Sequence, residues 1–421
     1  MNPRYRLTDH VFTVPLDHDD PAGQTVEVFA REVVDPGRAG DELPWLVFLQ
    51  GGPGGKSPRP QGVSPGWLGQ AVKTHRVLLL DQRGTGRSTP ITPTVASQFT
   101  SAEELARYLS LHRADAIVRD AEWIRRELCG DQPWETLGQS FGGFITLTYL
   151  SVAPEGLRAC YVTGGIPGLE ATADDVYART YPRVAAKNAE YYARYPADVA
   201  KVRRIADLLE SRNIRLPDGD RLTFGRLRAL GLAFGMGDGF ERVHWLLDEA
   251  SYASGELTDV FLHNLTLMTG FVENPLFAVL QEPCFGQGPV PNGWAAQRVL
   301  AEFPSFAADA DPLLFTGEMI YPWMFEEYRA LRPFAEAADI LAAKTDWPRL
   351  YDPARLAANE VPLAAVVYHD DMYVDAGLSL RTIRDLGSAR AWVTNEWEHD
   401  GVNASGGTVL ARLMDMAAGR L

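Results

Sequence analysis

The sequence predicts an α/β fold with a mainly parallel central sheet, helices on both of its faces, and a long helical insertion. Trp45–Leu49 and Arg76–Asp81 each contain a continuous apolar run, which is typical of strands buried on both faces. Amphipathic stretches with helical spacing lie between residues 101 and 128, so strand and helix patterns alternate here. Strand patterns then stop near residue 168 and return near residue 362. The sheet is therefore expected to be completed by two parts of the chain that are far apart in sequence.

Further strands are predicted on both sides of these runs. Residues 11–34 indicate two strands, and Thr25–Val33 alternates well enough for a strand with one buried face. Asp-Pro at residues 20–21 and Pro-Gly at residues 36–37 mark the ends of this pair, because both dipeptides favour turns. Arg158–Thr163 is the next strand expected in the first part of the chain.

The middle of the chain has a different character. It is rich in Ala, Arg, Glu, Leu and Tyr at helical spacing, and Pro312–Phe315 is the one short run in it that favours a strand. Beyond it, Pro362–Tyr368 and Ala389–Thr394 are expected strands, and Gly407–Ala417 is an expected closing helix. We therefore predict a core formed by residues 1–167 and 349–421, with residues 168–348 inserted as a mainly helical cap over the carboxyl edge of the sheet.

The composition limits the class of protein. Hydrophobic residues make up 46% and charged residues 23% of the 421 residues, as in a soluble globular protein. The formal net charge of -15 argues against nucleic acid as a partner. No apolar run reaches the roughly 18 residues that a membrane helix needs, and no apolar segment follows the polar start. Neither a membrane partner nor a secretion signal is therefore expected.

The cysteines indicate the cellular environment. Cys129, Cys160 and Cys284 form no CxxC pair, and their odd number disfavours a disulfide framework. This pattern predicts a reducing, cytoplasmic location. The chain also lacks an HExxH motif or a similar ligand cluster, so neither a metal nor an organic cofactor is expected. Nothing in the sequence specifies an oligomeric state.

A serine between glycines, Ser140, is the centre of the predicted site. It lies in Gly138-Gln139-Ser140-Phe141-Gly142, after a strand-like run at 134–137 and before a helix-like run at 144–150. A G-x-S-x-G pattern at a strand–helix turn is a nucleophile elbow, in which small residues let backbones crowd around a strained serine. Because a glycine-rich turn can also be a simple tight connection, a catalytic role requires a base, an acid and an oxyanion site elsewhere.

The base and the acid are expected near the end of the chain. His399 follows the last predicted strand, where a hydrolase with such an elbow carries its histidine. Of the eight histidines, those in the insertion are better explained by packing or exposure. Asp370 and Asp371 both follow the strand Pro362–Tyr368; the sequence register favours Asp371, with Asp370 as the alternative. The order Ser140, Asp371, His399 is the one this fold uses.

An oxyanion hole requires two backbone N–H groups aimed at the developing charge. One is expected to be the N–H of Phe141, directly after the nucleophile. The other is expected from the glycine-rich loop Gln50–Gly55, where we favour Gly52. Gly55-Lys56-Ser57 imitates the end of a phosphate-binding loop, but that motif requires glycine at position 50, which is glutamine. A nucleotide-binding role is therefore not expected.

Several motifs together resemble the proline iminopeptidase (prolyl aminopeptidase) family of α/β-hydrolases. They are Gln50–Gly55, Asp81–Ser88, Gly138–Gly143 and Glu398–Gly401, and the resemblance continues into the cap at Thr316–Glu326. The chain length and the large insertion resemble the longer bacterial form. The elbow is common to many hydrolases, whereas GGPGG joined to DQRG-x-GRS is more specific. The chain departs from the family at two positions. Gln50 stands where smaller members carry histidine, and Phe141 stands where many members carry tryptophan. Both positions contribute only backbone or packing.

The resemblance implies a serine aminopeptidase that releases an N-terminal residue, preferentially proline, from peptides through an acyl-enzyme intermediate. Its partners would be peptides with a free N-terminus, and a desolvated ammonium or imino cation requires a paired anion. The carboxylates expected to supply it are those of the cap, with the first two ranked highest: Glu282, Glu318 and Glu326. The apolar side chains expected to wall a pocket for a small ring are Phe285, Tyr321 and Trp323.

Alternatives stay open at this point. The arginines of Asp81–Ser88 could bind a substrate carboxylate, although ion pairs within the turn are the favoured explanation. An esterase or a tripeptidyl-type aminopeptidase on the same core is an alternative activity. A catalytically inactive α/β-hydrolase-fold binding protein is an alternative of another class, which the intact order of serine, acid and histidine disfavours.

Overall fold

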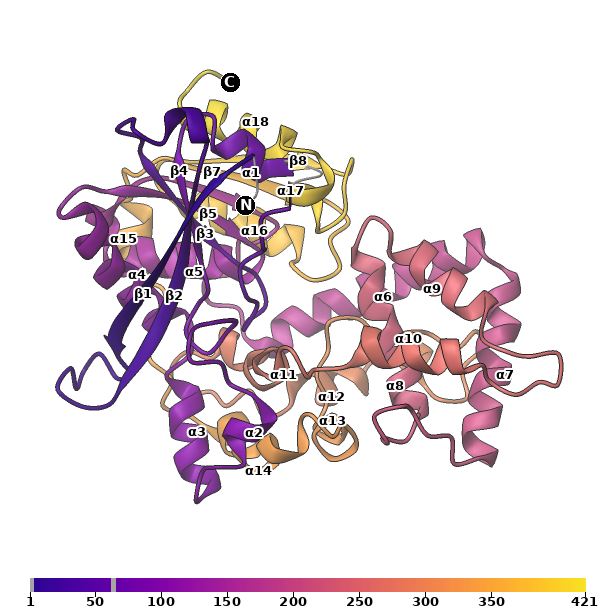
Figure 1. The fold of residues 1–421 in the computed structure, drawn as a ribbon. Helices are drawn as coiled ribbons and strands as arrows, with labels where there is room; N and C mark the ends of the chain where they lie inside the picture. Colours follow the sequence, from indigo (N-terminus) through magenta and orange to yellow (C-terminus); the bar gives the residue numbers. More distant parts are fainter. Residues whose placement is uncertain (1–3, 62–65) are drawn as a thin grey trace.

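The computed structural model describes residues 4–61 and 66–421, and a sheet of 8 strands forms the centre of this part of the chain (Figure 1). The strands are β1 (Arg6–Pro15), β2 (Thr25–Val34), β3 (Trp45–Leu49), β4 (Arg76–Leu80), β5 (Trp134–Gln139), β6 (Leu157–Thr163), β7 (Leu363–Tyr368) and β8 (Ala389–Thr394). Their spatial order is β1-β2-β4-β3-β5-β6-β7-β8. The β1–β2 and β2–β4 pairs are antiparallel, and all pairs from β4 to β8 are parallel.

Helices fill the connections of this sheet. Before β6 they are α1 (Gly66–Ala71), α2 (Pro93–Ala96), α3 (Ala102–Ser110), α4 (Ala114–Cys129) and α5 (Phe141–Val152). Between β6 and β7 they are α6 (Ala173–Arg194), α7 (Ala197–Ser211), α8 (Phe224–Arg228), α9 (Gly239–Asp248), α10 (Asp259–Thr269), α11 (Pro275–Leu280), α12 (Ala295–Leu300), α13 (Pro322–Glu327), α14 (Ala335–Ala343) and α15 (Pro353–Ala357). The last helices are α16 (Ala376–Asp385), α17 (Gly401–Ala404) and α18 (Thr408–Ala417). Figure 1 shows α6 to α10 extending away from the sheet, while α14 packs against α3.

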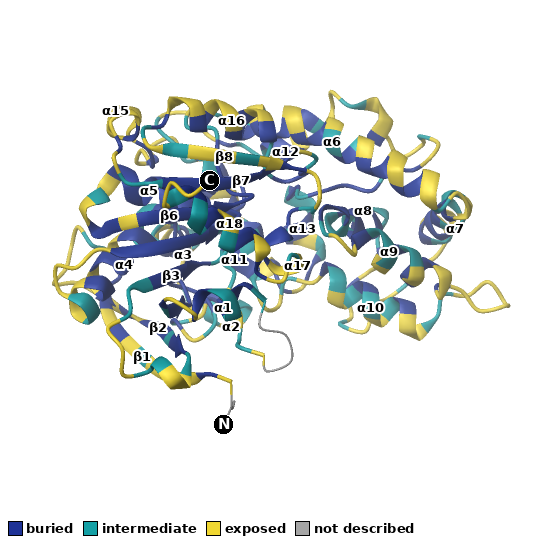
Figure 2. Ribbon diagram, turned by 90° about the horizontal axis from the view of Figure 1, so that it is seen from above, coloured by how far each residue is buried: buried dark blue, intermediate teal, exposed yellow. Residues whose placement is uncertain are grey.

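The apolar character of the predicted strands explains how the sheet is covered, and β3 is the clearest case. Leu46 and Phe48 pack with residues of α1 and α18 on one face. Val47 and Leu49 pack with residues of α4 and α5 on the other face. Each of these side chains is at most 2% exposed, and burying one of this size contributes about 1.5–3 kcal/mol. The outer strand β8 is largely exposed (Figure 2), so burial on both faces is confined to the middle of the sheet.

The predicted α/β class with a mainly parallel sheet is confirmed. The strands Trp45–Leu49 and Ala389–Thr394 have the predicted bounds, and the helix after the serine begins at Phe141, three residues earlier than predicted. Among the described residues, no helix is both long enough and apolar enough to cross a lipid bilayer.

The prediction of a strand at Pro312–Phe315 is wrong. These residues are extended, but they pair with no strand. The physical reason is that their backbone groups are already bonded to side chains. The Asn188 amide, for example, binds both the N–H and the C=O of Phe315, which leaves neither group for a neighbouring strand.

The arginines of the DQRG motif form ion pairs within the fold. Arg83 is completely buried, and its guanidinium donates to both carboxylate oxygens of Asp120 on α4, at 2.7 and 2.5 Å. It also donates to the carbonyl oxygens of Pro15 and Leu16 at the end of β1, at 3.0 and 2.7 Å. Arg87 lies at the surface, where it pairs with Asp9 at 2.7 Å. The motif therefore ties β1 and α4 to the end of β4. Its arginines have the structural role that was favoured, but their ion pairs reach partners outside the turn.

We predict that Arg83→Ala lowers the free energy of unfolding by about 3–5 kcal/mol, because the buried Asp120 carboxylate loses its guanidinium partner and keeps only the contact with His18 at 2.8 Å. The matched control is Arg87→Ala, which removes a half-exposed cation and should lower the free energy of unfolding by less than about 1 kcal/mol. Urea-induced unfolding of the two variants measures both values. Equal losses of stability would contradict the prediction.

Candidate active site

Ser140 lies at the sharp turn between β5 and α5. Its backbone has φ 54° and ψ -124°, a conformation that residues with a side chain rarely adopt. Two hydrogen bonds hold the turn: the N–H of Ser140 donates to Thr163 O at 3.0 Å, and the N–H of Gly143 donates to Ser140 O at 2.7 Å. The serine side chain is thereby fixed at the carboxyl end of β5, at the first turn of α5.

The glycines around Ser140 are required by close contacts between backbones. A Cβ atom at Gly142 would lie 1.9 Å from the carbonyl oxygen of Leu49 at the end of β3. A Cβ atom at Gly138 would lie 2.4 Å from the carbonyl oxygen of Gly142. These distances are far inside van der Waals contact, so alanine at either position would push β3, β5 and α5 apart.

Asp371 and His399 form a buried pair. Asp371 Oδ2 lies 2.7 Å from His399 Nδ1, and each residue is 3% exposed. The other carboxylate oxygen accepts the N–H groups of Tyr373 and Val374 at 2.8 and 3.1 Å. Asp370, the alternative acid, instead bonds Arg183 at 3.1 Å and is more exposed. Of the two candidate acids, the structure therefore places Asp371 against the histidine.

The Asp371 contact fixes the chemistry of the imidazole. Since the carboxylate accepts the Nδ1 proton, Nε2 is left as the atom that can take a proton from a nucleophile. Burial alone would lower the pKa of His399, but the Asp371 carboxylate, its hydrogen bond and the nearby Glu318 outweigh this effect. The net result is a pKa above the usual value of 6.5.

Ser140 and His399 each lie against one of the two residues that follow β6. A Cβ atom at Gly164, which has φ +52°, would lie 3.1 Å from His399 Nδ1. A Cβ atom at the next residue, Gly165, would lie 2.2 Å from the carbonyl oxygen of Ser140. The serine and the histidine are thus held against one dipeptide without side chains, although they come from distant parts of the sequence.

The glycine-rich loop after β3 also reaches the serine. A Cβ atom at Gly51 would lie 2.8 Å from the Cβ of Ser140, and Gly52 has φ +138°, which favours glycine. The side chain of Gln82 donates to the carbonyl oxygen of Gln50 at 2.9 Å and anchors the loop. Phe141 is the first residue of α5, so its N–H has no partner within the helix. Phe141 and the loop that carries Gly52 therefore both lie next to the serine.

Two cap glutamates have raised pKa values. Burial raises the pKa of Glu318 to about 7, opposed by the charge of His399 and supported by that of Asp371. Burial raises the pKa of Glu282 to about 7 as well, although two backbone N–H groups oppose it. In the described part of the chain, neither carboxylate forms an ion pair with a lysine or an arginine. Glu318 is therefore a carboxylate beside the Asp371–His399 pair that lacks a cationic partner.

Glu282 has a structural contact that the sequence did not indicate. Its carboxylate oxygens accept the N–H groups of Ala295 and Ala296 at 3.0 and 2.9 Å, at the start of α12. This contact closes the base of the loop between residues 282 and 295. A carboxylate has about four lone-pair sites, so Glu282 keeps the capacity to accept further donors.

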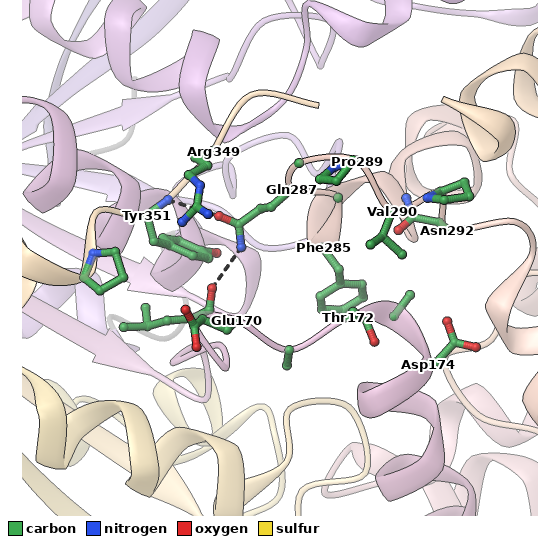
Figure 3. Close-up of a pocket in the computed structure, with 17 residues that line it drawn as sticks. Glu170, Thr172, Asp174, Phe285, Gln287, Pro289, Val290, Asn292, Arg349 and Tyr351 are labelled. Carbon is green, nitrogen blue, oxygen red and sulfur yellow. Dashed lines mark hydrogen bonds between the residues drawn. The ribbon is translucent and has the colours of Figure 1, made fainter. Parts of the chain in front are cut away.

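Phe285 connects the chain between β6 and β7 to helix α5. Its ring centroid lies 5.8 Å from that of Phe144, which lies 5.9 Å from that of Phe141. Phe285 also lines a cavity of about 210 Å³ together with Gln287 and Tyr351 (Figure 3). None of the serine, acid and histidine candidates lines this cavity, so it borders the site rather than forming it.

Tyr321 and Trp323 lie together inside the cap. Tyr321 is 2% exposed, its hydroxyl lies 3.0 Å from that of Tyr181, and its ring stacks on Trp323 at a centroid distance of 5.7 Å. A Cβ atom at Gly225 would come within 2.7 Å of the Trp323 ring. The two aromatic side chains are thus held rigidly by α6 and α8.

Glu326, the third predicted carboxylate, differs from Glu282 and Glu318 in its surroundings. It is exposed on α13, whose buried face consists of Met324 and Phe325. The geometry of the helix turns Glu326, the residue after Phe325, toward solvent. Within residues 4–61 and 66–421, no group of three or more His, Cys, Asp or Glu side chains is arranged to hold a metal ion.

Two neighbours of the site were missed at the level of sequence. The Gln281 side chain lies near Glu318 and counters the rise of its pKa, and its position next to Glu282 was the one available indication. Tyr373 presents its ring edge-on to His399, with centroids 4.8 Å apart at an interplanar angle of 89°. Its place two residues after the acid could have suggested this contact. An isolated amide or tyrosine carries no pattern that distinguishes it from packing residues.

Comparisons with known proteins agree with this arrangement. A family model described as "alpha/beta hydrolase fold" matches residues 44–226. The chain is 48% identical over 407 residues to a proline iminopeptidase of Aeromonas sobria, covering 96% of this chain and 95% of that protein. It is 34% identical over 432 residues to the proline iminopeptidase aneH of Aspergillus aculeatus, covering 99% and 94%. Among solved structures, a thermophilic esterase from Thermogutta terrifontis has a TM-score of 0.42 at 12% identity, covering 97% of this chain and 98% of that one.

The mainly parallel sheet, with a serine at the strand–helix turn and an Asp–His pair beside it, defines this chain as an α/β-hydrolase. The similarity to both iminopeptidases extends over nearly the whole length of each chain. The chain belongs to the proline iminopeptidase family.

We predict that a fluorophosphonate probe labels Ser140 at a rate that rises with pH through a pKa above 6.5, because His399 must be neutral to accept the serine proton. In Asp371→Asn, burial still lowers the pKa of His399 but the carboxylate no longer raises it. The pH at which the labelling rate begins to fall on the acid side should therefore move lower. The labelling rate should also fall by at least about 100-fold. Ser140→Ala is the unlabelled control. A fall on the acid side that Asp371→Asn leaves at the same pH would contradict this assignment.

Proposed function

We propose that this protein is a serine aminopeptidase of the proline iminopeptidase type, which releases an N-terminal residue, preferentially proline, from peptides. The family relationship supports the activity. The observation that carries the substrate class is the Glu318 carboxylate, which lies beside the Asp371–His399 pair without a cationic partner among the described residues. Leaving such a carboxylate unpaired is costly, and the cationic amine of a substrate would offset that cost.

In the proposed mechanism, Ser140 Oγ attacks the first peptide carbonyl carbon while His399 Nε2 takes the serine proton. Asp371 stabilises the resulting imidazolium through Nδ1. The N–H groups of Gly52 and Phe141 donate to the oxyanion. His399 then gives its proton to the leaving amine, the C–N bond breaks, and an acyl-enzyme forms. Water, deprotonated by His399, attacks the acyl carbon and releases the free amino acid and Ser140.

The proposed amine site places Glu318 nearest to the reacting atoms. Its charge influences the pKa values of both His399 and Tyr373, so it lies within electrostatic reach of the catalytic pair. Glu282 shares the neighbours Tyr177 and Cys284 with Glu318. The two carboxylates therefore face one region of the cap, and a substrate amine between them would fix the first residue. Endopeptidase substrates, which lack that cation, would bind poorly.

The remaining parts of the proposal concern the cap and the cellular location. We assign residues 168–348 to a cap that supplies the amine site, with Phe285, Tyr321 and Trp323 as apolar walls for a small ring. The three cysteines carry free thiols, and Cys160 and Cys284 are buried, which supports a reducing, cytoplasmic environment.

A substrate panel tests the activity. The amides of proline and of alanine, a tripeptidyl amide and a simple acyl ester, all with the same chromogenic leaving group, should give the highest kcat/KM for the proline amide. Rapid ester turnover without amide cleavage would favour the esterase alternative, and preference for the tripeptidyl amide would favour the tripeptidyl alternative. Absence of fluorophosphonate labelling would instead favour an inactive binding protein.

We predict that Glu318→Gln raises KM for the proline amide by roughly 30-fold, the equivalent of about 2 kcal/mol for a lost desolvated charge pair. The ester, which has no amine, is the control substrate and should be unaffected. In the native protein, KM for the amide should also rise as pH falls through about 7, because Glu318 becomes protonated there. The glutamine variant should lose this dependence, while Glu326→Gln at the exposed site should retain it. An unchanged KM in Glu318→Gln would contradict the amine site.

A further inference from the structure

An extended segment without secondary structure, Leu313–Gly317, leads directly to Glu318. It is largely buried: Leu313, Phe315 and Thr316 are each at most 4% exposed. A buried backbone must satisfy its N–H and C=O groups, yet this segment belongs to no helix and no sheet. The partners of these groups therefore determine where Glu318 lies.

Asn188 on α6 provides the central contact. Its side-chain oxygen accepts the N–H of Phe315 at 2.8 Å, and its side-chain nitrogen donates to the C=O of Phe315 at 3.0 Å. The same nitrogen also donates to Val184 O at 2.8 Å, one turn earlier in the helix. Asn188 is 0% exposed, so its amide substitutes for a neighbouring strand and fixes Phe315 to α6.

Arg228 at the end of α8 holds the residues on both sides of Phe315. Its Nε donates to Leu314 O at 2.7 Å, and its carbonyl oxygen accepts the N–H of Thr316 at 2.9 Å. The guanidinium is 9% exposed and packs over the rings of Phe224 and Phe306. No carboxylate pairs with it in the described part of the chain. Arg228 is thus a buried cation that lacks an acidic partner but bonds the backbone of Leu313–Gly317. We infer that its role is to hold this segment in place.

The far end of the segment reaches the loop that carries the catalytic acid. A Cβ atom at Gly317 would lie 2.6 Å from a methyl group of Val184 and 2.8 Å from the terminal methyl of Met372. Met372 directly follows Asp371. The backbone before Glu318 is therefore confined between α6 on one side and the acid loop on the other, and a shift of the segment would move Glu318 relative to Asp371 and His399.

We propose that Asn188 and Arg228 are positioning residues for amine recognition: they fix the extended segment so that Glu318 presents its carboxylate beside the catalytic pair. This inference rests on the proposed role of Glu318. Neither side chain needs to touch the substrate. Their loss should weaken binding of the substrate amine and leave the reactivity of Ser140 intact, because the bonds that build the serine turn and the Asp371–His399 pair involve other residues.

The test compares a substrate that has an amine with one that lacks it. Asn188→Ala should raise KM for the proline amide roughly tenfold, within the loss that a misplacement of about 1 Å can cause. The ester turnover and the fluorophosphonate labelling rate should stay within about twofold of the native protein. Arg228→Met should act in the same direction, and Arg228→Lys, which retains a donor, should recover part of the effect.

Asn359 offers a matched control. It is also a buried asparagine that clamps backbone, donating to Val361 O and Gly387 O and accepting the N–H of Val361, but it lies between α15 and β7. Asn359→Ala should lower the melting temperature by a similar amount to Asn188→Ala without changing KM for the amide. All assays are run below the melting temperature of every variant.

The outcomes separate this inference from the proposed function. If Glu318→Gln raises KM but Asn188→Ala and Arg228→Met leave it unchanged, the positioning role is refuted while the amine site stands. If amide and ester activities of Asn188→Ala fall equally, the residue is merely structural and the inference is again overturned. If Glu318→Gln itself has no effect on KM, the proposed amine site is refuted, and the positioning role that rests on it is refuted with it.

Discussion

The close approach of backbones around Ser140 is the constraint on which the rest of the structure depends. β3 meets α5 at Gly142, the chain after β6 meets the serine carbonyl at Gly165, and the loop after β3 meets the serine side chain at Gly51. Each contact tolerates no Cβ, so the glycines specify how closely the strands and the helix pack. A strained serine conformation persists only where surrounding structure holds it this firmly.

That constraint also brings distant groups together. The dipeptide at residues 164–165 contacts the serine on one side and His399 on the other, while parallel pairing of β6 with β7 places the acid loop at the same edge. Two backbone N–H groups bond one carboxylate oxygen of Asp371 and orient the other toward the histidine. The geometry of the proposed catalytic residues therefore results from the alignment of strand ends, with little contribution from flexible side-chain placement.

The chain between β6 and β7 adds carboxylates near these strand ends by a different physical means. No sheet aligns it, so side chains such as Asn188 and Arg228 bond its extended backbone directly. This explains why Pro312–Phe315 looked like a strand: Leu313 and Phe315 are buried, as in a strand, but the backbone of the segment bonds an amide and a guanidinium. Glu282 and Glu318 also have different environments: Glu282 accepts the N–H groups at the start of α12, whereas the charges of His399 and Asp371 influence the pKa of Glu318.

The sequence by itself determined the α/β class, the strands of the core and the order of serine, acid and histidine along the chain, because these depend on local apolar patterning and on glycines at fixed spacing. Only the tertiary structure decided which aspartate contacts His399, that Glu326 points to solvent, and that Gln281 and Tyr373 border the site. Those facts depend on which groups from distant segments come within hydrogen-bonding distance. Such contacts leave no periodic pattern in a single chain, because each is made by single side chains on segments without regular structure.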